Sequence, residues 1–122
     1  MARTANLVIK LATGVEDAER VAQAFSVAST ALAADVNVSL WLAGEASWLA
    51  IPGRAEQFAL AHSAPLHELL GLLIDGAKVT LCTQCAVRRN IKDGDQIPGI
   101  RIAGSATFVE EITNESTQAL VY

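Results

Sequence analysis

The stretch Lys78-Val79-Thr80-Leu81-Cys82-Thr83-Gln84-Cys85-Ala86-Val87-Arg88-Arg89 decides the fold class of this chain and its candidate chemistry. Residues 78–81 favour extended structure and are mostly apolar, so they predict an inner strand. Residues 86–89 predict a short helix directly after it. A cysteine at such a strand-to-helix turn meets unpaired backbone N–H groups and the positive end of the helix dipole. Both favour the thiolate, which is the reactive form of cysteine.

The two cysteines of this stretch are expected to have different surroundings. Arg88 and Arg89 follow Cys85 closely, so a helix would bring both side chains near its sulfur. We therefore expect Cys85 on a wet, electropositive rim, as the catalytic cysteine with Arg88 stabilising its thiolate. Cys82, at the end of a buried strand, is the second catalytic candidate. The alternative for either is a small buried hydrophobe, as free cysteines often are.

Length and composition predict one domain over residues 1–122. The chain has 122 residues, of which 52% are hydrophobic, and such a length suits a single core. No stretch approaches the roughly 18 apolar residues that a membrane helix needs. The apolar surplus therefore predicts a sheet buried on both faces, a subunit interface, or both.

Charge and the first residues predict the compartment and exclude one class of partner. The net charge is −4 and the isoelectric point is near 5.0, whereas nucleic-acid binding requires a basic face. The start of the chain lacks the pattern of a signal peptide. We therefore expect a cytoplasmic protein whose cysteines are reduced.

Strand and helix patterns alternate along the chain. Strands are predicted at residues 7–11, 36–42, 78–81, 100–103 and 119–122. Helices are predicted at residues 16–32, 46–49 and 65–76, and a last one begins at a capping-box pattern over Thr107-Phe108-Val109-Glu110. Strands separated by helices pair in parallel through right-handed crossovers. The expected fold is a three-layer α/β/α domain with a mostly parallel five-stranded sheet.

Ligands of such sheets bind beyond the carboxyl ends of the strands. Three loops converge there, at residues 12–14, 44–47 and 82–89. The expected substrate-binding residues from these loops and the adjoining turn are Thr13, Gly14, Gly44, Glu45, Trp48, Gln84 and Arg89. Trp48 has a second interpretation, as a side chain packed beneath a surface helix.

The segment Leu81-Cys82-Thr83-Gln84-Cys85-Ala86-Val87-Arg88-Arg89-Asn90-Ile91 and the tail Pro98-Gly99-Ile100-Arg101-Ile102-Ala103-Gly104 resemble the DsrE/DsrF/YchN-like family. The resemblance covers essentially the whole chain, and Asn90 stands where glycine is usual. It implies a sulfur-relay protein whose active cysteine, matching Cys85, carries a persulfide. It also implies a homo-oligomer, a trimer or hexamer in preference to a dimer, together with sulfur donor and acceptor proteins.

Other functional classes remain open. The Cys-x-x-Cys spacing also suits a dithiol redox module, and the same fold could serve as a non-catalytic oligomeric subunit that binds a small anion. His62 and His67 lack the spacing of zinc ligands, so we expect no metal. No organic cofactor is expected, because cysteine itself would carry the sulfur. The sequence favours a persulfide-carrying sulfurtransferase, with enzymatic activity left open.

A surface for self-association is expected in the weakly patterned segment after the second strand. The apolar residues there are Trp48, Leu49, Ile51, Phe58 and Leu60. A sheet of this size cannot bury them all, and monomers rarely expose a large apolar patch. These residues are therefore predicted to meet another copy of the chain.

Overall fold

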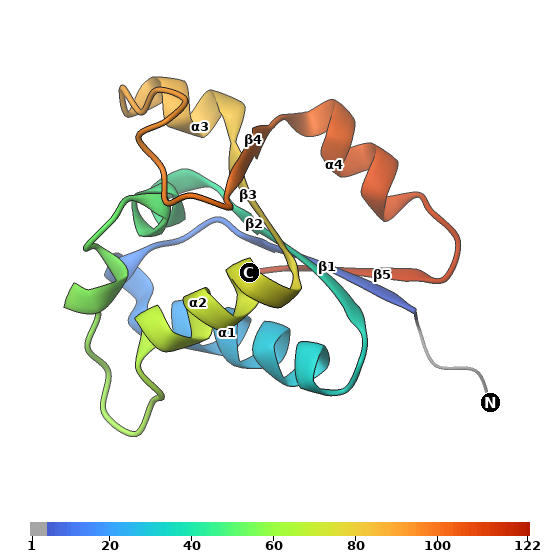
Figure 1. The fold of residues 1–122 in the computed structure, drawn as a ribbon, viewed down its shortest axis with the longest axis horizontal. Helices are drawn as coiled ribbons and strands as arrows, with labels where there is room; N and C mark the ends of the chain where they lie inside the picture. Colours follow the sequence, from blue (N-terminus) through green and yellow to red (C-terminus); the bar gives the residue numbers. More distant parts are fainter. Residues whose placement is uncertain (1–4) are drawn as a thin grey trace.

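The computed structural model describes residues 5–122 and has one five-stranded sheet at its centre (Figure 1). The strands are β1 (Asn6–Leu11), β2 (Asn37–Leu42), β3 (Lys78–Cys82), β4 (Arg101–Ala103) and β5 (Thr117–Val121). Their order across the sheet is β4-β3-β2-β1-β5, and every neighbouring pair is parallel. The expected α/β fold with a parallel five-stranded sheet is confirmed.

Helices connect the strands. The α-helices are α1 (Ala18–Ala33), α2 (Leu66–Gly76), α3 (Thr83–Arg88) and α4 (Ser105–Ile112). Short 3-10 helices are η1 (Val15–Asp17), η2 (Gly44–Ala50) and η3 (Ala55–Gln57). Helices α1 and α2 cover one face of the sheet, and α4 covers part of the other (Figure 1). Helix α3 lies at the carboxyl end of β3.

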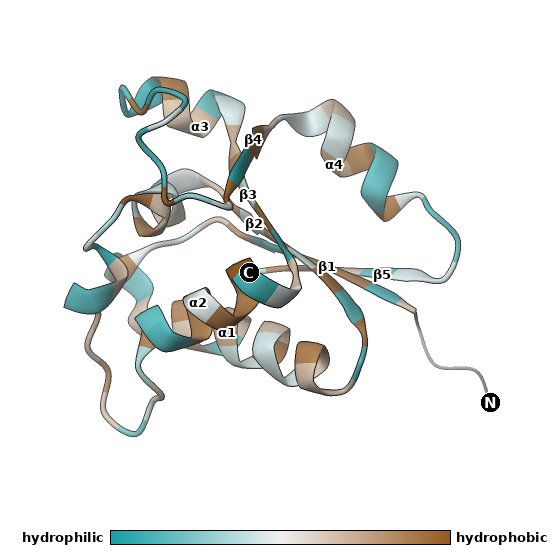
Figure 2. Cartoon of the chain, viewed as in Figure 1, coloured by the Kyte–Doolittle hydropathy of each residue, from teal (hydrophilic) through white to brown (hydrophobic). Residues whose placement is uncertain are grey.

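Alternation along the strands gives the two faces of the sheet different chemistry. Towards α1 and α2 the row Ile9, Leu40 and Val79 is aligned across β1, β2 and β3 and fully or nearly fully buried. Figure 2 shows hydrophobic residues along these strands and on α2. Successive side chains of a strand point to opposite faces, so the face towards α4 carries polar residues between apolar ones.

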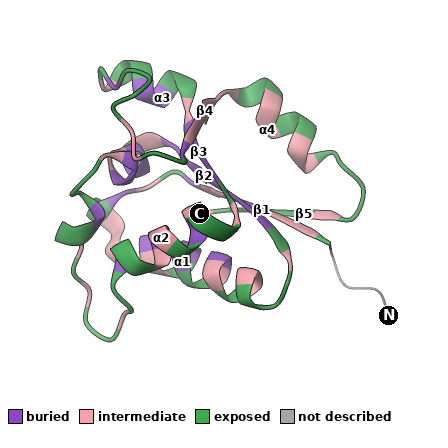
Figure 3. Ribbon diagram, in the orientation of Figure 1, coloured by how far each residue is buried: buried purple, intermediate pink, exposed green. Residues whose placement is uncertain are grey.

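The α1–α2 side holds the main hydrophobic core. Its helical members recur at three- and four-residue spacing: Val21, Ala24, Phe25 and Ala28 on α1, and Leu66, Leu70 and Leu73 on α2. Figure 3 shows the buried residues concentrated along the central strands, whereas α4 has none. The stability of the fold therefore depends mainly on the α1–α2 face.

Two helices end in a left-handed residue, and one helix start differs from the sequence analysis. Asp35, after α1, has a φ of 64°, and Asn90, after α3, has a φ of 55°. Both residue types tolerate this left-handed conformation better than most, so the turn at Asn90 survives without glycine. The predicted capping box at Thr107 is wrong, because α4 already begins at Ser105 and Gly104 is its N-cap.

The weakly patterned segment does not form the expected exposed patch. Leu49 is 2% exposed. Trp48, Ile51 and Phe58 pack against the core as half-buried side chains, and Leu60 is half-buried. Most of this apolar surface is therefore covered by the chain itself, through η2 and η3. The large hydrophobic residues that are exposed lie elsewhere: Val15, Leu72, Val87, Val109, Leu120 and Val121.

In residues 5–122, no helix combines the length and the apolar character needed to cross a bilayer.

Candidate functional site

The carboxyl ends of β1 and β2 are joined by unusually close backbone contacts. Gly44 follows β2 with a φ of 52°, and a Cβ placed on it would lie 2.3 Å from the carbonyl oxygen of Ala12. A Cβ on Gly14 would lie 2.7 Å from the carbonyl oxygen of Glu45. Only glycine fits both positions without a shift of the backbone. The convergence of Gly14, Gly44 and Glu45 expected from the sequence is present.

Helix α3 begins earlier than the sequence predicts, and this reverses the surroundings of the two cysteines. Because the helix starts at Thr83, Cys82 is its N-cap and Cys85 lies inside its first turn. Cys85 is only 9% exposed, whereas Cys82 is half-buried. The expectation that Cys85 lies on a wet rim is therefore wrong, and Cys82 is the more accessible sulfur.

The surroundings of Cys82 lower the pKa of its thiol. Partial burial raises the pKa of this thiol, but hydrogen bonds from the backbone and thiol of Cys85 and from the backbone N–H of Gln84 lower it. The positive charge of Lys10 lowers it further. The net effect is a pKa below the ordinary value of 9.0. The thiolate of Cys82 is therefore favoured more than that of an ordinary cysteine.

Cys85 links Cys82 to the loop after β2. The backbone nitrogen of Gly44 lies 3.2 Å from the sulfur of Cys85 and donates a hydrogen bond to it. Cys85 also lies three residues after Cys82, in the first turn of α3. Cys85 therefore contacts the loop after β2 and shares this helical turn with Cys82.

The two arginines have different roles. Arg89 donates to the carbonyl oxygen of Cys85 at 3.0 Å and forms an ion pair with Glu45 at 2.8 Å. It thereby ties the end of α3 to the loop after β2. Arg88 is exposed, and we find no hydrogen bond or ion pair for it within residues 5–122. Arg89, and not Arg88, is the arginine that contacts Cys85.

Trp48 and Glu45 line a neighbouring cavity of about 230 Å³. The guanidinium of Arg54 lies 4.8 Å from the centre of the Trp48 ring. Val15 and Phe58 complete its apolar wall. Trp48 is therefore half-buried and shares this cavity with Glu45, the partner of Arg89.

The other predicted binding residues are placed as follows. Gln84 has an exposed side chain, and its backbone N–H is among the groups that lower the pKa of Cys82. The hydroxyl oxygens of Thr13 and Ser47 are buried, and the described part of the chain supplies no hydrogen-bond partner for either. His62 and His67 are both exposed. The described residues contain no cluster of His, Cys, Asp and Glu suited to a metal ion.

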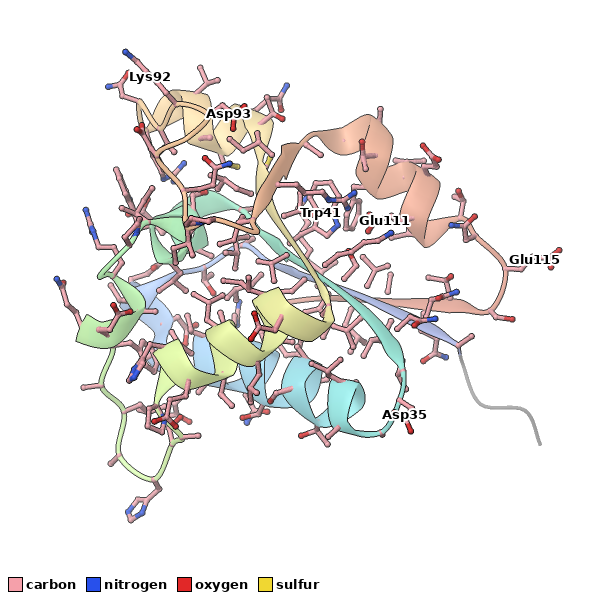
Figure 4. The ribbon with its side chains drawn as sticks, viewed as in Figure 1. Asp35, Trp41, Lys92, Asp93, Glu111 and Glu115 are labelled. Atoms are coloured by element: carbon pink, nitrogen blue, oxygen red, sulfur yellow. The ribbon has the colours of Figure 1, made fainter. Side chains whose placement is uncertain are left out.

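Sequence reasoning missed a polar network on the sheet face beneath α4. Glu111 of α4 accepts hydrogen bonds from Ser39 at 2.6 Å and from the indole N–H of Trp41 at 3.0 Å. It also pairs with Arg101, whose Nε donates to Thr80 at 2.6 Å. Figure 4 shows Trp41 and Glu111 between α4 and the sheet.

Aromatic contacts extend this network towards Cys82. The rings of Trp41 and Phe108 meet edge to face, with their centres 5.3 Å apart. The Lys10 ammonium lies 4.7 Å from the centre of the Phe108 ring, and the same charge acts on Cys82. The sequence signal that could have revealed this network was Lys10, because a charged residue in an otherwise apolar strand requires a partner.

The chain is similar to known proteins in structure and matches a known family in sequence. The YchN protein of E. coli has a similar structure, with a TM-score of 0.66 at 15% identity over 100% of both chains. MTH1491 of Methanobacterium thermoautotrophicum, a protein of unknown function, has a TM-score of 0.68 at 12% identity over 96% of this chain and 98% of its own. No curated protein matches the sequence. The sequence profile of the DsrE/DsrF-like family matches residues 6–121. The chain therefore belongs to the DsrE/DsrF-like family.

Proposed function

We propose that this protein carries sulfur as a persulfide on Cys82 and transfers it between a donor and an acceptor protein in the cytoplasm. The DsrE/DsrF-like family is associated with sulfur relay, and that association supports the general role. The single observation that carries the assignment to Cys82 is its position as the half-buried N-cap of α3. The lowered pKa of its thiol agrees with this position and favours the thiolate before loading.

Exposure also favours Cys82 over Cys85 as the loaded residue. A sulfur donor must reach the attacking thiolate, and the outer sulfur of a persulfide must reach an acceptor thiol. Cys82 is half-buried and Cys85 is buried, so the first can meet another molecule more readily than the second. Both cysteines are free, which suits a reducing compartment. Cys85 then supports Cys82 by hydrogen bonding.

Loading with inorganic polysulfide tests the proposal. The reduced protein is incubated with polysulfide, desalted at once, alkylated and mapped by mass spectrometry. The Cys85→Ser variant should gain one sulfur on residue 82, and the Cys82→Ser variant should gain none. Sulfur found only on Cys85, or no sulfur on Cys82 of the Cys85→Ser variant, would contradict the assignment. A non-catalytic subunit would instead show two slowly reacting thiols and no added sulfur.

A further inference from the structure

We propose that Cys85 releases the sulfur loaded on Cys82 as hydrogen sulfide, and that it does so by forming a disulfide with Cys82. The proposal rests on the persulfide function above and adds a second outcome at the same site. When an acceptor is present, the outer sulfur leaves by transfer. When none is present, the chain's own second thiol reduces it.

The position of both cysteines on one helical turn carries this inference. Cys82 is the N-cap of α3 and Cys85 lies three residues later, so both side chains stand on the same side of its first turn. The Cys85 sulfur therefore needs only a short movement to attack the sulfur of Cys82.

Gly44 prepares Cys85 for that attack. Its backbone nitrogen lies 3.2 Å from the Cys85 sulfur, so the N–H stabilises negative charge as the thiol loses its proton. The burial of Cys85, which is 9% exposed, keeps thiols of other molecules away from it. Cys82 is therefore the sulfur that exchanges with other molecules, and Cys85 reacts with Cys82.

The reaction balances without a further reactant. The Cys85 sulfur attacks the inner sulfur of the Cys82 persulfide, which forms the Cys82–Cys85 bond and breaks the bond to the outer sulfur. The outer sulfur leaves with the electron pair of the broken bond and takes the Cys85 proton, so that hydrogen sulfide is released. The sulfane sulfur is reduced, and the two cysteine sulfurs are oxidised to a disulfide. A small dithiol or a dithiol protein must then reduce this disulfide to restore the chain.

A time course after polysulfide loading tests the proposal. The loaded wild-type protein is desalted, kept without reductant, and sampled for trapped sulfide and for the alkylated or disulfide-linked peptide. We expect sulfide in an amount equal to the persulfide lost, with a matching gain of the Cys82–Cys85 disulfide. The Cys85→Ser variant should keep its persulfide, with sulfide release at least about tenfold slower.

The outcomes distinguish the failure of the release step from the failure of the proposed persulfide function. A Cys85→Ser variant that never gains sulfur contradicts the persulfide function itself. A variant that loads while wild-type protein keeps both its persulfide and a free Cys85 thiol overturns only the release step. Equal sulfide release from wild type and variant also overturns it. The wild-type time course decides the question even if the Cys85→Ser variant folds poorly.

Discussion

The backbone nitrogen of Gly44 lies 3.2 Å from the sulfur of Cys85, and this contact joins the loop after β2 to the first turn of α3. The loop can occupy this position because Gly44 has no side chain. Its φ is 52°, and a Cβ would lie 2.3 Å from the Ala12 carbonyl oxygen. A structural constraint on two loops thus fixes a hydrogen-bond donor beside a buried thiol.

Replacing Gly44 by alanine should therefore destabilise the fold and disturb Cys85. We expect a loss of about 2–4 kcal/mol in the free energy of unfolding, from backbone strain and the clash with Ala12 together. Urea denaturation measures this loss. Gly53→Ala is the matched control, since Gly53 also has a positive φ, 87°, but open space around its Cβ position. The control should lose only about 1 kcal/mol, and equal losses would show that the contact with Ala12 relaxes at no cost.

Alkylation should distinguish the two thiols of the native protein. Cys82 is the more exposed sulfur and has the lowered pKa, so iodoacetamide should label it first at neutral pH. The midpoint of its rate against pH should lie below the ordinary thiol pKa of 9.0. Peptide mapping over time gives both rates. Preferential labelling of Cys85, as the sequence pattern predicts, would show that the loop after β2 opens readily and exposes this thiol.

Removing the Arg89 side chain should loosen the end of α3. Arg89 binds the Cys85 carbonyl and Glu45, but Glu45 is 53% exposed, so the ion pair itself contributes little. We expect Arg89→Ala to lower the free energy of unfolding by about 1 kcal/mol, mainly through the lost hydrogen bond. Arg88→Ala, an adjacent exposed arginine, should change it by less than about 0.5 kcal/mol. Thermal denaturation of both variants gives the comparison, and a larger effect at Arg88 would contradict the assigned contacts.

Glu111 should make stability depend on pH in the acid range. Burial raises the pKa of this carboxyl, but hydrogen bonds from Ser39, Trp41 and Arg101 outweigh burial and hold it below the ordinary 4.5. A carboxyl with a lower pKa in the folded state stabilises the fold above its unfolded pKa, and this contribution is lost as the pH falls through the folded value.

Urea titrations from neutral to acid pH should therefore show a loss of stability that Glu111→Gln does not share. At neutral pH the variant should already be less stable by about 1–2 kcal/mol, because Arg101 loses its carboxylate. Glu110→Gln, an exposed neighbour on α4, is the control and should behave as wild type. The same acid profile in all three proteins would show that Glu111 is not the titrating group.

Self-association is expected at the open edge of β5. This strand ends the sheet, and its residues Leu120 and Val121 are 37% and 69% exposed. An uncovered apolar edge strand favours pairing with another copy. Light scattering should give a multiple of the 12.8 kDa chain mass, with a trimer or hexamer expected from the family resemblance.

A charge at this edge should weaken the assembly. Val121→Lys should shift the mass towards 12.8 kDa, whereas Val87→Lys, at an equally exposed valine on α3, should not. A monomeric wild-type protein would refute self-association. An assembly sensitive only to Val87→Lys would place the contact on α3.

The strands and their order along the chain could be predicted because they depend on local periodicity. Residues 78–81, for example, are mostly apolar and favour extended structure, and Val79 among them belongs to the buried row that crosses β1, β2 and β3. The start of α3 could not be predicted as readily. Thr83 is a weak helix former at a position where the chain leaves the sheet, and the packing of that turn decides the boundary.

The Glu111 network depends on residues far apart in sequence. Ser39 and Trp41 precede Glu111 by about seventy residues, and no local pattern connects them. Sheet order and register bring them together, with Trp41 aligned beside Thr80 and Thr80 beside Arg101. Such a cluster becomes predictable only once the order of the strands is known.

The contrast between the two sides of the sheet has a consequence for local motion. Helix α4 contributes no buried residue, and much of its attachment runs through Glu111 and Phe108. Elements with few buried apolar contacts open locally well below the free energy of global unfolding. Amide hydrogens of α4 should therefore exchange with solvent long before those of α1, which means that the polar face above Lys10 can be uncovered while the rest of the molecule stays folded.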